Sequence, residues 1–256
     1  MVKLADLAEA DFTRLQAVIE WLVNHPDSGL YARQVPVREI DSKWLERHGG
    51  VVRSLVQGLS GRDKLGLTLK PSALLRGRLL DGALANGGPL DFAAPVPQWD
   101  ALKPVPRVAL ILENLQSLLA LPAWPGSGLV ALHGGGYAVD LLGGIVWLKT
   151  VPLYYWGDLD GHGFAILNRL RSHLPGVVSL MMDQPTLSDH ADLAVPDPNP
   201  VTAKLPHLTD AEQAAYLELQ SSGRRLEQER VPWDEALRHL ARAGLRTGVR
   251  RSRAEH

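Results

Sequence analysis

Residues 151–161 read VPLYYWGDLDG, an apolar run that leads into two aspartates, Asp158 and Asp160. A continuous apolar run of this length is typical of a strand that is buried on both faces of a parallel sheet. Residues 161–174, which follow, have the pattern of a helix. Strand followed at once by helix is the repeating unit of an α/β fold. The stretch therefore predicts a parallel sheet covered by helices, with two acids at the carboxyl end of one strand.

The same alternation continues on both sides of this stretch. Further buried strands are predicted at three apolar segments, 108–112, 128–132 and 177–182. Helices are predicted between and after them, at 114–121, 137–149, 211–226 and 233–243. A long polar connection with five prolines lies at residues 184–206. The predicted fold class is therefore α/β, a parallel sheet flanked by helices.

The first part of the chain has a different pattern. Apolar residues recur at helical spacing over residues 4–23, and a second helix is predicted from residue 43 to 59, capped by Asp41 or Ser42. Short strands are expected at residues 64–80, around Pro71. Helix, turn, helix and small strands together fit a small α+β, winged-helix-like unit, although many small α+β domains share this layout.

A stretch rich in glycine and proline, residues 86–106, separates these two patterns. Such composition is typical of a domain boundary. We therefore predict a winged-helix-like domain at residues 1–95 and a sheet domain with C-terminal helices at 105–245. The alternative is an extended segment that lies on one continuous domain.

Composition limits the class of protein and the kind of site. The chain has 256 residues, of which 45% are hydrophobic and none is cysteine. A metal would therefore be held by oxygen or histidine ligands, and carboxylates favour Mg²⁺ or Mn²⁺ over zinc. No secretory signal or membrane span is evident, so we expect a cytoplasmic protein that does not bind membranes. No dinucleotide-binding, P-loop or G-x-S-x-G motif occurs, which argues against a dehydrogenase, an ATPase or an esterase.

Charge is balanced overall but not along the chain. The formal net charge is −1, yet nine arginines and five acids follow from residue 224 onward, with Arg250, Arg251 and Arg253 close together. A basic end of this kind can bind a phosphate backbone. The alternative is a solvated helix with a frayed tail.

Three carboxylates follow predicted strands directly. Glu113 follows the first buried strand, and Asp158 and Asp160 follow the third. Ligands of open parallel sheets bind beyond the carboxyl ends of the strands, and neighbouring carboxylates repel unless a proton or a cation intervenes. A divalent cation at this edge is one interpretation. In the other, Glu113 and Asp160 stabilise the starts of the helices that follow them.

Glycines and histidines lie near the same edge. Gly134, Gly135 and Gly136 follow the second strand and form either a phosphate contact or a tight turn. His162, just past the acidic pair, is a candidate for contact with a phosphate or a water, although it and His133 could equally be ordinary exposed side chains.

These features resemble a known family. A glutamate after the first strand and Asp-x-Asp after the third, in an alternating sheet, resemble the Toprim domains of topoisomerases, primases and nucleases. The runs LILENLQSLLALP, GGGYAVDLLGGIVWLKTVPLYYWGDLDGHGFAILNRLR, RLEQERVPW and DSGLYARQVPVREIDSKWLERHGG resemble the JetD family, the nuclease subunits of the bacterial Wadjet anti-plasmid system. The resemblance extends over most of the chain, roughly residues 21–240.

The resemblance implies a site, partners and an activity. JetD-like proteins are similar to the A subunit of topoisomerase VI, with a winged-helix unit ahead of the Toprim unit. They cut double-stranded circular plasmid DNA together with an SMC-type motor complex, and they are expected to be homodimers. Matched by motif, Glu113, Asp158 and Asp160 would bind Mg²⁺, for which Mn²⁺ could substitute, and Glu229 or alternatively Glu227 would join them as a further acid.

Full-length family members have a sizeable N-terminal region ahead of the winged-helix part, and we expect this chain to be shortened there. In topoisomerases of this lineage a winged-helix tyrosine attacks DNA, and Tyr31 is the sole tyrosine among residues 1–104. We favour metal-dependent hydrolysis instead. The DNA-contacting side chains would then be Arg33, Lys43, Arg47 and His162, with Glu46 near the first three. The alternatives are a topoisomerase VI-like subunit that forms tyrosine-linked breaks and a non-catalytic subunit that clamps DNA.

Overall fold

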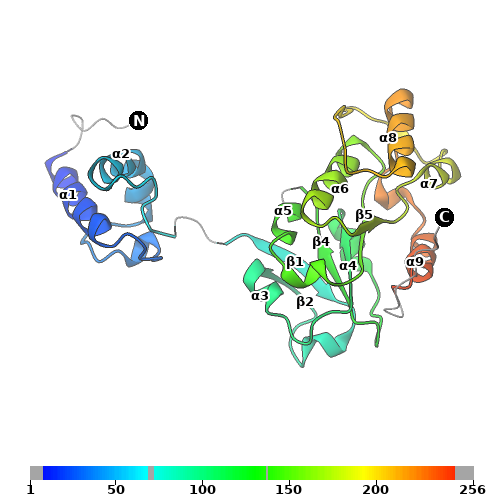
Figure 1. Ribbon diagram of the computed structural model, residues 1–256, viewed down its shortest axis with the longest axis horizontal. Coiled ribbons are helices and arrows are strands. Elements are labelled where there is room, and N and C mark those ends of the chain that lie inside the picture. The colour runs from blue at the N-terminus through cyan, green and yellow to red at the C-terminus, as the bar shows by residue number, and fades with distance from the viewer. Residues whose placement is uncertain (1–7, 69–71, 137, 246–256) are drawn as a thin grey trace. The chain divides into compact units, whose positions relative to one another are not determined.

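The computed structural model describes residues 8–68, 72–136 and 138–245 (Figure 1). The chain divides into two compact units, Met1–Ser72 and Ala73–His256, and each unit is described by itself. The predicted basic cluster at Arg250, Arg251 and Arg253 lies outside the described residues.

The first unit is built on two helices, α1 (Glu9–Asn24) and α2 (Ser42–Ser60), with a short 3₁₀ helix, η2 (Ala32–Gln34), between them. Both long helices were predicted. Asp41 caps α2, because its Oδ1 accepts a hydrogen bond from the Trp44 N–H at 2.7 Å. Apolar residues of the two helices form a core of their own, which includes Leu15, Val18, Leu22, Val52 and Val56.

The described part of the first unit contains no strand, and its extended pairing is a single bridge between Tyr31 and Thr68. The sequence had predicted small strands at residues 64–80 in this unit. The strand in that range, β1 (Leu74–Leu79), belongs instead to the sheet of the second unit. The winged-helix assignment of the first unit therefore stays a prediction.

The second unit contains the predicted α/β sheet. Its strands are β1, β2 (Asp91–Pro95), β3 (Val108–Leu112), β4 (Leu129–His133), β5 (Leu153–Trp156) and β6 (Val177–Ser179). They lie in the order β2-β1-β4-β3-β5-β6. The four strands from β3 to β6 are parallel, and β1 is antiparallel to both of its neighbours. β3 is buried at every position, as its apolar run predicted.

β1 and β2 form a hairpin within the stretch that the sequence analysis treated as the end of the first domain and the boundary. The hairpin extends the sheet because β1 pairs with β4, and α3 (Val96–Asp100) supplies Trp99, which is fully buried. A Cβ on Gly77 would lie 2.7 Å from Trp99, so the small residue lets the ring lie against the strand. Trp99 Nε1 also donates a hydrogen bond to Leu75 O at 2.9 Å. Composition alone does not reveal this packing.

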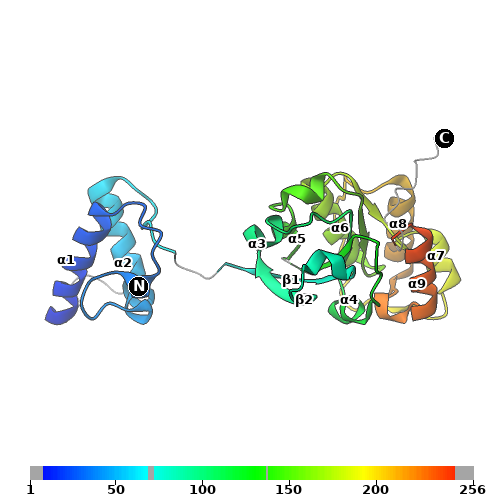
Figure 2. The same cartoon turned by 90° about the horizontal axis from the view of Figure 1, so that it is seen from below.

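Helices cover both faces of the sheet. α5 (Ala138–Leu142) and α6 (Gly161–His173) lie on one face and α4 (Leu115–Ala120) on the other (Figure 2). A single helix was predicted at residues 137–149. The structure has α5 followed by the 3₁₀ helix η4 (Val146–Lys149), with two glycines between them.

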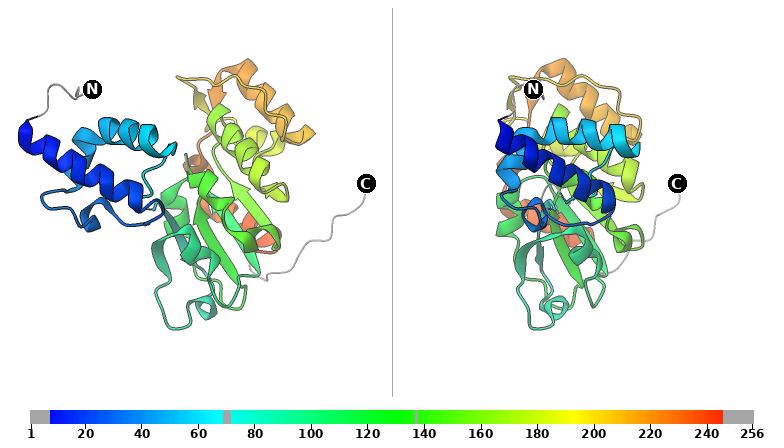
Figure 3. Two further views of the ribbon diagram at one scale, coloured as in Figure 1. Left: turned by 60° about the vertical axis from the view of Figure 1, so that its left-hand side comes forward. Right: turned by 90° about the vertical axis from the view of Figure 1, so that its left-hand side faces the viewer.

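The C-terminal elements pack at the β6 end of the second unit. α8 (Asp210–Ser222) lies beside α6 in both views of Figure 3, and α9 (Trp233–Arg242) follows it. The long connection expected at residues 184–206 contains α7 (Gln184–Asp189) and β7 (Val195–Pro196), and β7 pairs with β8 (Arg224–Arg225). A bilayer-crossing helix, long and apolar throughout, does not occur among the described residues.

Candidate functional site at the carboxyl edge of the sheet

The order of the strands changes direction between the neighbouring strands β3 and β5. After β3 the chain crosses through α4 to β4 on one side, and after β5 it crosses through α6 to β6 on the other. Neighbouring parallel strands whose connections leave in opposite directions define a topological switch point, where ligands of α/β sheets bind. Glu113 and Asp158 follow these two strands. The sheet thus brings together two of the predicted residues from distant parts of the chain.

Glu113 is fixed through one of its carboxylate oxygens. Its Oε2 accepts a hydrogen bond from the Tyr155 hydroxyl and another from the Asp158 N–H, both at 3.1 Å. Tyr155 lies on β5 and is fully buried. The Glu113 N–H donates to Trp156 O at 3.1 Å and continues the ladder between β3 and β5 by one residue. The side chain is therefore held at the carboxyl end of β3, beside the turn that follows β5.

Asp158 is held by a segment from far along the chain. Its Oδ1 accepts a hydrogen bond from the Gln228 N–H at 2.7 Å. Beside it, Leu159 and Leu226 exchange two backbone hydrogen bonds, of 2.9 and 3.0 Å, in an isolated antiparallel bridge. Residues 226–230, which contain the 3₁₀ helix η5 (Gln228–Arg230), are thereby attached to the acidic turn after β5.

The surroundings of Glu113 and Asp158 disfavour the charged form of both carboxyl groups. Burial, followed by the nearby Asp158, raises the pKa of Glu113 from 4.5 to about 7. Burial also raises the pKa of Asp158 from 3.8 to about 6; the Gln228 N–H opposes this rise, and the charge of Asp160 adds to it. Strongly perturbed carboxyls mark a candidate functional site.

Asp160 has the capping role that was one of its two interpretations. It is 6% exposed, and its Oδ1 accepts a hydrogen bond from the Gly163 N–H at 2.7 Å at the start of α6. Glu113 does not cap α4. That position belongs to Asn114, whose Oδ1 accepts from the Ser117 N–H at 2.9 Å. The capping interpretation thus applies to Asp160 and not to Glu113.

Two glycines allow the acidic turn to approach its neighbours. A Cβ on Gly163 would lie 2.1 Å from Asp158 O, and a Cβ on Gly157 would lie 2.6 Å from Glu113 Oε2. Gly134, in the predicted phosphate-binding run, would meet Ile111 at 2.3 Å. These values favour the tight-turn interpretation of the glycine run.

The segment at residues 226–230 brings both candidate acids, Glu227 and Glu229, to the site. Glu229 Oε1 accepts a hydrogen bond from the Asn114 side chain. Glu227 is paired with Arg225 at 2.6 Å and with Arg230 at 3.4 Å. Glu229 has no ion pair with any residue that the structure describes, which favours it over Glu227 as the further acid.

The donor set suits a hard divalent cation, although the side chains do not enclose one. Among residues 8–68, 72–136 and 138–245, no group of three or more histidine, aspartate or glutamate side chains is arranged to hold a metal ion. The fit rests on chemistry: Glu113 and Asp158 offer hard oxygen ligands whose charge is poorly compensated. In addition, Nε2 of Gln228 is a buried donor with no partner among the described residues.

The histidines near this edge differ in setting. His162 is exposed at the start of α6, where it is free to meet a ligand. His133 ends β4 and is half-buried, and burial lowers its pKa, opposed by the Glu113 carbonyl. His133 was named from the sequence with the same two interpretations as His162, and its register opposite Leu112 places it near Glu113.

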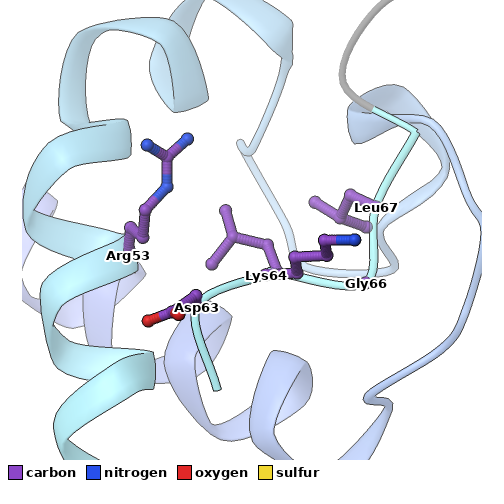
Figure 4. Close-up of a pocket in the computed structure, with 6 residues that line it drawn as sticks. Arg53, Asp63, Lys64, Gly66 and Leu67 are labelled. Carbon is purple, nitrogen blue, oxygen red and sulfur yellow. The ribbon is translucent and has the colours of Figure 1, made fainter.

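The predicted DNA contacts of the first unit are all exposed: Arg33, Lys43 and Arg47, together with Glu46. None of them lines the hollow of about 610 Å³ in this unit, which lies between α2 and residues 63–67 (Figure 4). Arg53 and Lys64 line that hollow and form no ion pair with a described residue. The sequence analysis missed these two cations, because α2 and the segment after it come together only in the fold.

The structure thus shows an α/β protein with acidic side chains at the switch point of a mostly parallel sheet. The model of the family described as "Wadjet protein JetD, C-terminal" matches residues 66–240, and the chain belongs to this family. It is thus a subunit of a Wadjet plasmid-defence system and works in a complex with other subunits. Residues 2–57 are similar to a second family, described as "Uncharacterized protein conserved in bacteria N-term (DUF3322)". No curated protein matches the chain.

Proposed function

We propose that this chain is the Mg²⁺-dependent endonuclease subunit of its Wadjet complex and hydrolyses phosphodiester bonds of closed-circular, double-stranded plasmid DNA. The observation that carries the proposal is the pair Glu113 and Asp158, two poorly compensated carboxyls at the switch point of the sheet. A site that disfavours its own negative charge gains stability from a divalent cation. Family membership supports the nuclease role through the resemblance to Toprim domains.

Each residue has a distinct role in the proposal. Glu113 and Asp158 bind Mg²⁺, for which Mn²⁺ substitutes, and Asp160 and Glu229 complete the site. Tyr155 and the Asp158 N–H hold Oε2 of Glu113, which leaves Oε1 for the ligand. Asp160 uses Oδ1 for the cap of α6 and retains Oδ2.

Bound Mg²⁺ supplies a Lewis acid that stabilises charge on the phosphate and lowers the pKa of a bound water. The chain's own residues orient this chemistry. The buried β3 and β5 fix the two carboxylates, and exposed His162 is positioned to meet a phosphate. In the first unit, Arg33, Lys43 and Arg47 contact the DNA backbone as point charges.

The proposed assembly is a homodimer, so that two sites address the two strands, in contact with an SMC-type motor complex. In this arrangement the motor presents the DNA and the dimer cuts it.

The proposal is tested by linearisation of supercoiled plasmid by the complete Wadjet complex with Mg²⁺ or Mn²⁺. The parent chain is compared with Asp158→Asn and with the control Asp192→Asn, which changes an exposed aspartate. We expect metal-dependent cutting by the parent and the control and a loss of at least a hundredfold for Asp158→Asn, as is typical of a lost catalytic ligand. Equal cutting by all three, or no cutting by the complete complex, would contradict the proposal.

The hydrolytic route is tested separately with Tyr31→Phe. Tyr31 is 49% exposed and lies in the first unit. We expect this variant to cut at the parental rate and no protein to remain covalently linked to the DNA ends. A covalent adduct that disappears in Tyr31→Phe would favour the topoisomerase-like alternative.

A further inference from the structure

Gln228 occupies an unusual place in the candidate site. It is 2% exposed, although its segment lies at the surface and its neighbour Glu229 is exposed. Buried glutamines normally have their hydrogen-bonding capacity used, because an unpaired polar group removed from water is costly. Its bonds therefore indicate what the residue does.

Gln228 bonds to both turns that carry the candidate ligands. Its backbone N–H donates to Asp158 Oδ1 at 2.7 Å, and its side-chain Oε1 accepts from the Asn114 N–H at 3.1 Å. Asn114 directly follows Glu113. One residue thus joins the end of β3 to the end of β5, and it does so at the level of the two carboxylates.

The orientation of the side-chain amide follows from these bonds. The Asn114 N–H is a donor, so the amide atom that faces it is the oxygen, and Nε2 points elsewhere. Nε2 is buried and has no hydrogen-bond partner among the described residues. It belongs to the same amide group as Oε1, so this unused donor lies beside the Glu113–Asn114 peptide.

We propose that Gln228 is a positioning residue: it fixes the separation of Glu113 and Asp158, and its free Nε2–H donates to an oxygen of the hydrated cation that the pair binds. This inference rests on the proposed function and deepens it. Leaving a buried amide donor unpaired is costly, and a bound ligand that accepts its hydrogen bond would remove that cost. Here one end is paired with the turn after β3, and the other is left for a ligand.

Two variants separate the two ends of the amide. Gln228→Met keeps the approximate volume and removes both the acceptor and the donor, whereas Gln228→Glu keeps an acceptor oxygen for the Asn114 N–H. The backbone bond to Asp158 is available in both. The matched control is Gln220→Met, which removes a partly buried glutamine on α8 away from the site.

The first readout is hydrogen exchange of the Asn114 amide in the metal-free protein. We expect exchange at least tenfold faster in Gln228→Met than in the parent, and protection retained in Gln228→Glu and Gln220→Met. Unchanged exchange in Gln228→Met would overturn the positioning role. This measurement needs no metal and no activity, so it stands even where the proposed nuclease function fails.

The second readout is the affinity for Mn²⁺, followed by the paramagnetic resonance of the free ion, with the thermal unfolding midpoint recorded alongside. Loss of a residue that supports metal ligands typically weakens binding about 10- to 100-fold. We expect that loss in Gln228→Met and not in Gln220→Met, with similar unfolding midpoints. Equal Mn²⁺ affinities would overturn the inference, whereas a parent chain that binds no Mn²⁺ would contradict the proposed function itself.

Discussion

A buried and a partly buried glutamate of the second unit have opposite electrostatic settings. Glu212 on α8 is 3% exposed, and its carboxylate accepts hydrogen bonds from Arg171, Ser179 and the Thr209 N–H. Burial alone would raise the pKa of Glu212, but these partners, Arg171 first, hold it below the ordinary value. Glu113 forms no ion pair with a cation in the described part of the chain, and its pKa is raised to about 7.

The charge of Glu212 stabilises the fold through its ion pair, whereas the charge of Glu113 is left for the proposed cation. Arg171 also donates to Val177 O at 3.1 Å and His207 O at 2.9 Å, so the ion pair fastens β6 and the segment before α8 to α6. Glu113 bonds to a neutral hydroxyl and a backbone N–H. A buried carboxylate without a cation lowers the stability of the fold, and a bound cation restores it.

The largest effect on stability is expected at the paired site. Glu212→Ala leaves Arg171 buried without its partner, which typically costs about 3–5 kcal/mol in the free energy of unfolding. Urea denaturation of the metal-free protein measures it. The control Glu218→Ala, on the same helix, is expected to cost less than about 1 kcal/mol. If Glu212→Ala lowers the free energy of unfolding no more than Glu218→Ala does, the ion pair does not stabilise the fold and the contrast with Glu113 is wrong.

The next effect is expected at the unpaired site and concerns the cation. A ligand at about 100 times its Kd stabilises the folded state by about 2.7 kcal/mol. We expect Mn²⁺ to stabilise the parent by this order and to leave Glu113→Gln unchanged. Thermal unfolding with and without metal provides the comparison. Equal stabilisation of both proteins would place the cation elsewhere.

A third effect concerns pH in the absence of metal. The pKa of Glu113 is higher folded than unfolded, so between about 4.5 and 7 the folded state holds more protons and stability falls as pH rises. Glu113→Gln removes this loss, and we expect it to be more stable than the parent by roughly 2 kcal/mol at pH 8, after allowance for residual solvent exposure. At pH 4 the two should be alike. A stability difference between the two proteins that does not change across this range would contradict the raised pKa.

The smallest effect on stability is expected in the first unit, where paired and unpaired cations can be compared. Arg14 is paired with Asp11 at 2.9 Å and with Glu39, whereas Arg53 and Lys64 line the hollow of the first unit without an ion pair to any described residue. Changing both Arg53 and Lys64 to Gln should alter stability by less than about 0.5 kcal/mol.

The same double change should weaken binding of plasmid DNA and lower the slope of log K against log salt by about 2. Fluorescence anisotropy over a salt series measures the slope. Arg38→Gln with Lys149→Gln removes two other cations and serves as the control. An unchanged slope in the Arg53 and Lys64 variant would show that the hollow does not meet phosphate.

Much of the second unit was predictable because its signals are local. The apolar runs of β3 and β5 and the acids that follow them are visible in the sequence, and the sheet places Glu113 and Asp158 together as expected. The hairpin of β1 and β2 was missed, because the packing of Trp99 against Gly77 is a contact between separate segments and is not visible in the local sequence pattern. Their stretch is rich in glycine and proline, and it was interpreted as a boundary.

The support of the site was not predictable from the sequence. Gln228 is one polar residue in a charged run, and neither its burial nor its bonds to Asn114 and Asp158 follow from local pattern. Asp160 had two interpretations, cap and ligand, and the structure shows the cap. The metal, the nuclease activity and the homodimer stay predictions.

The attachment of residues 226–230 to the acidic turns also affects the order in which contacts form during synthesis, because these residues are made after the sheet. Synthesis runs from the N-terminus, and Gln228 comes 114 residues after Asn114. All the sheet strands from β1 to β6, with both carboxylates, leave the ribosome before the glutamine that joins their turns. A chain whose translation stops before residue 228 therefore has both acids and their direct hydrogen bond but lacks the second connection that Gln228 makes between the two turns.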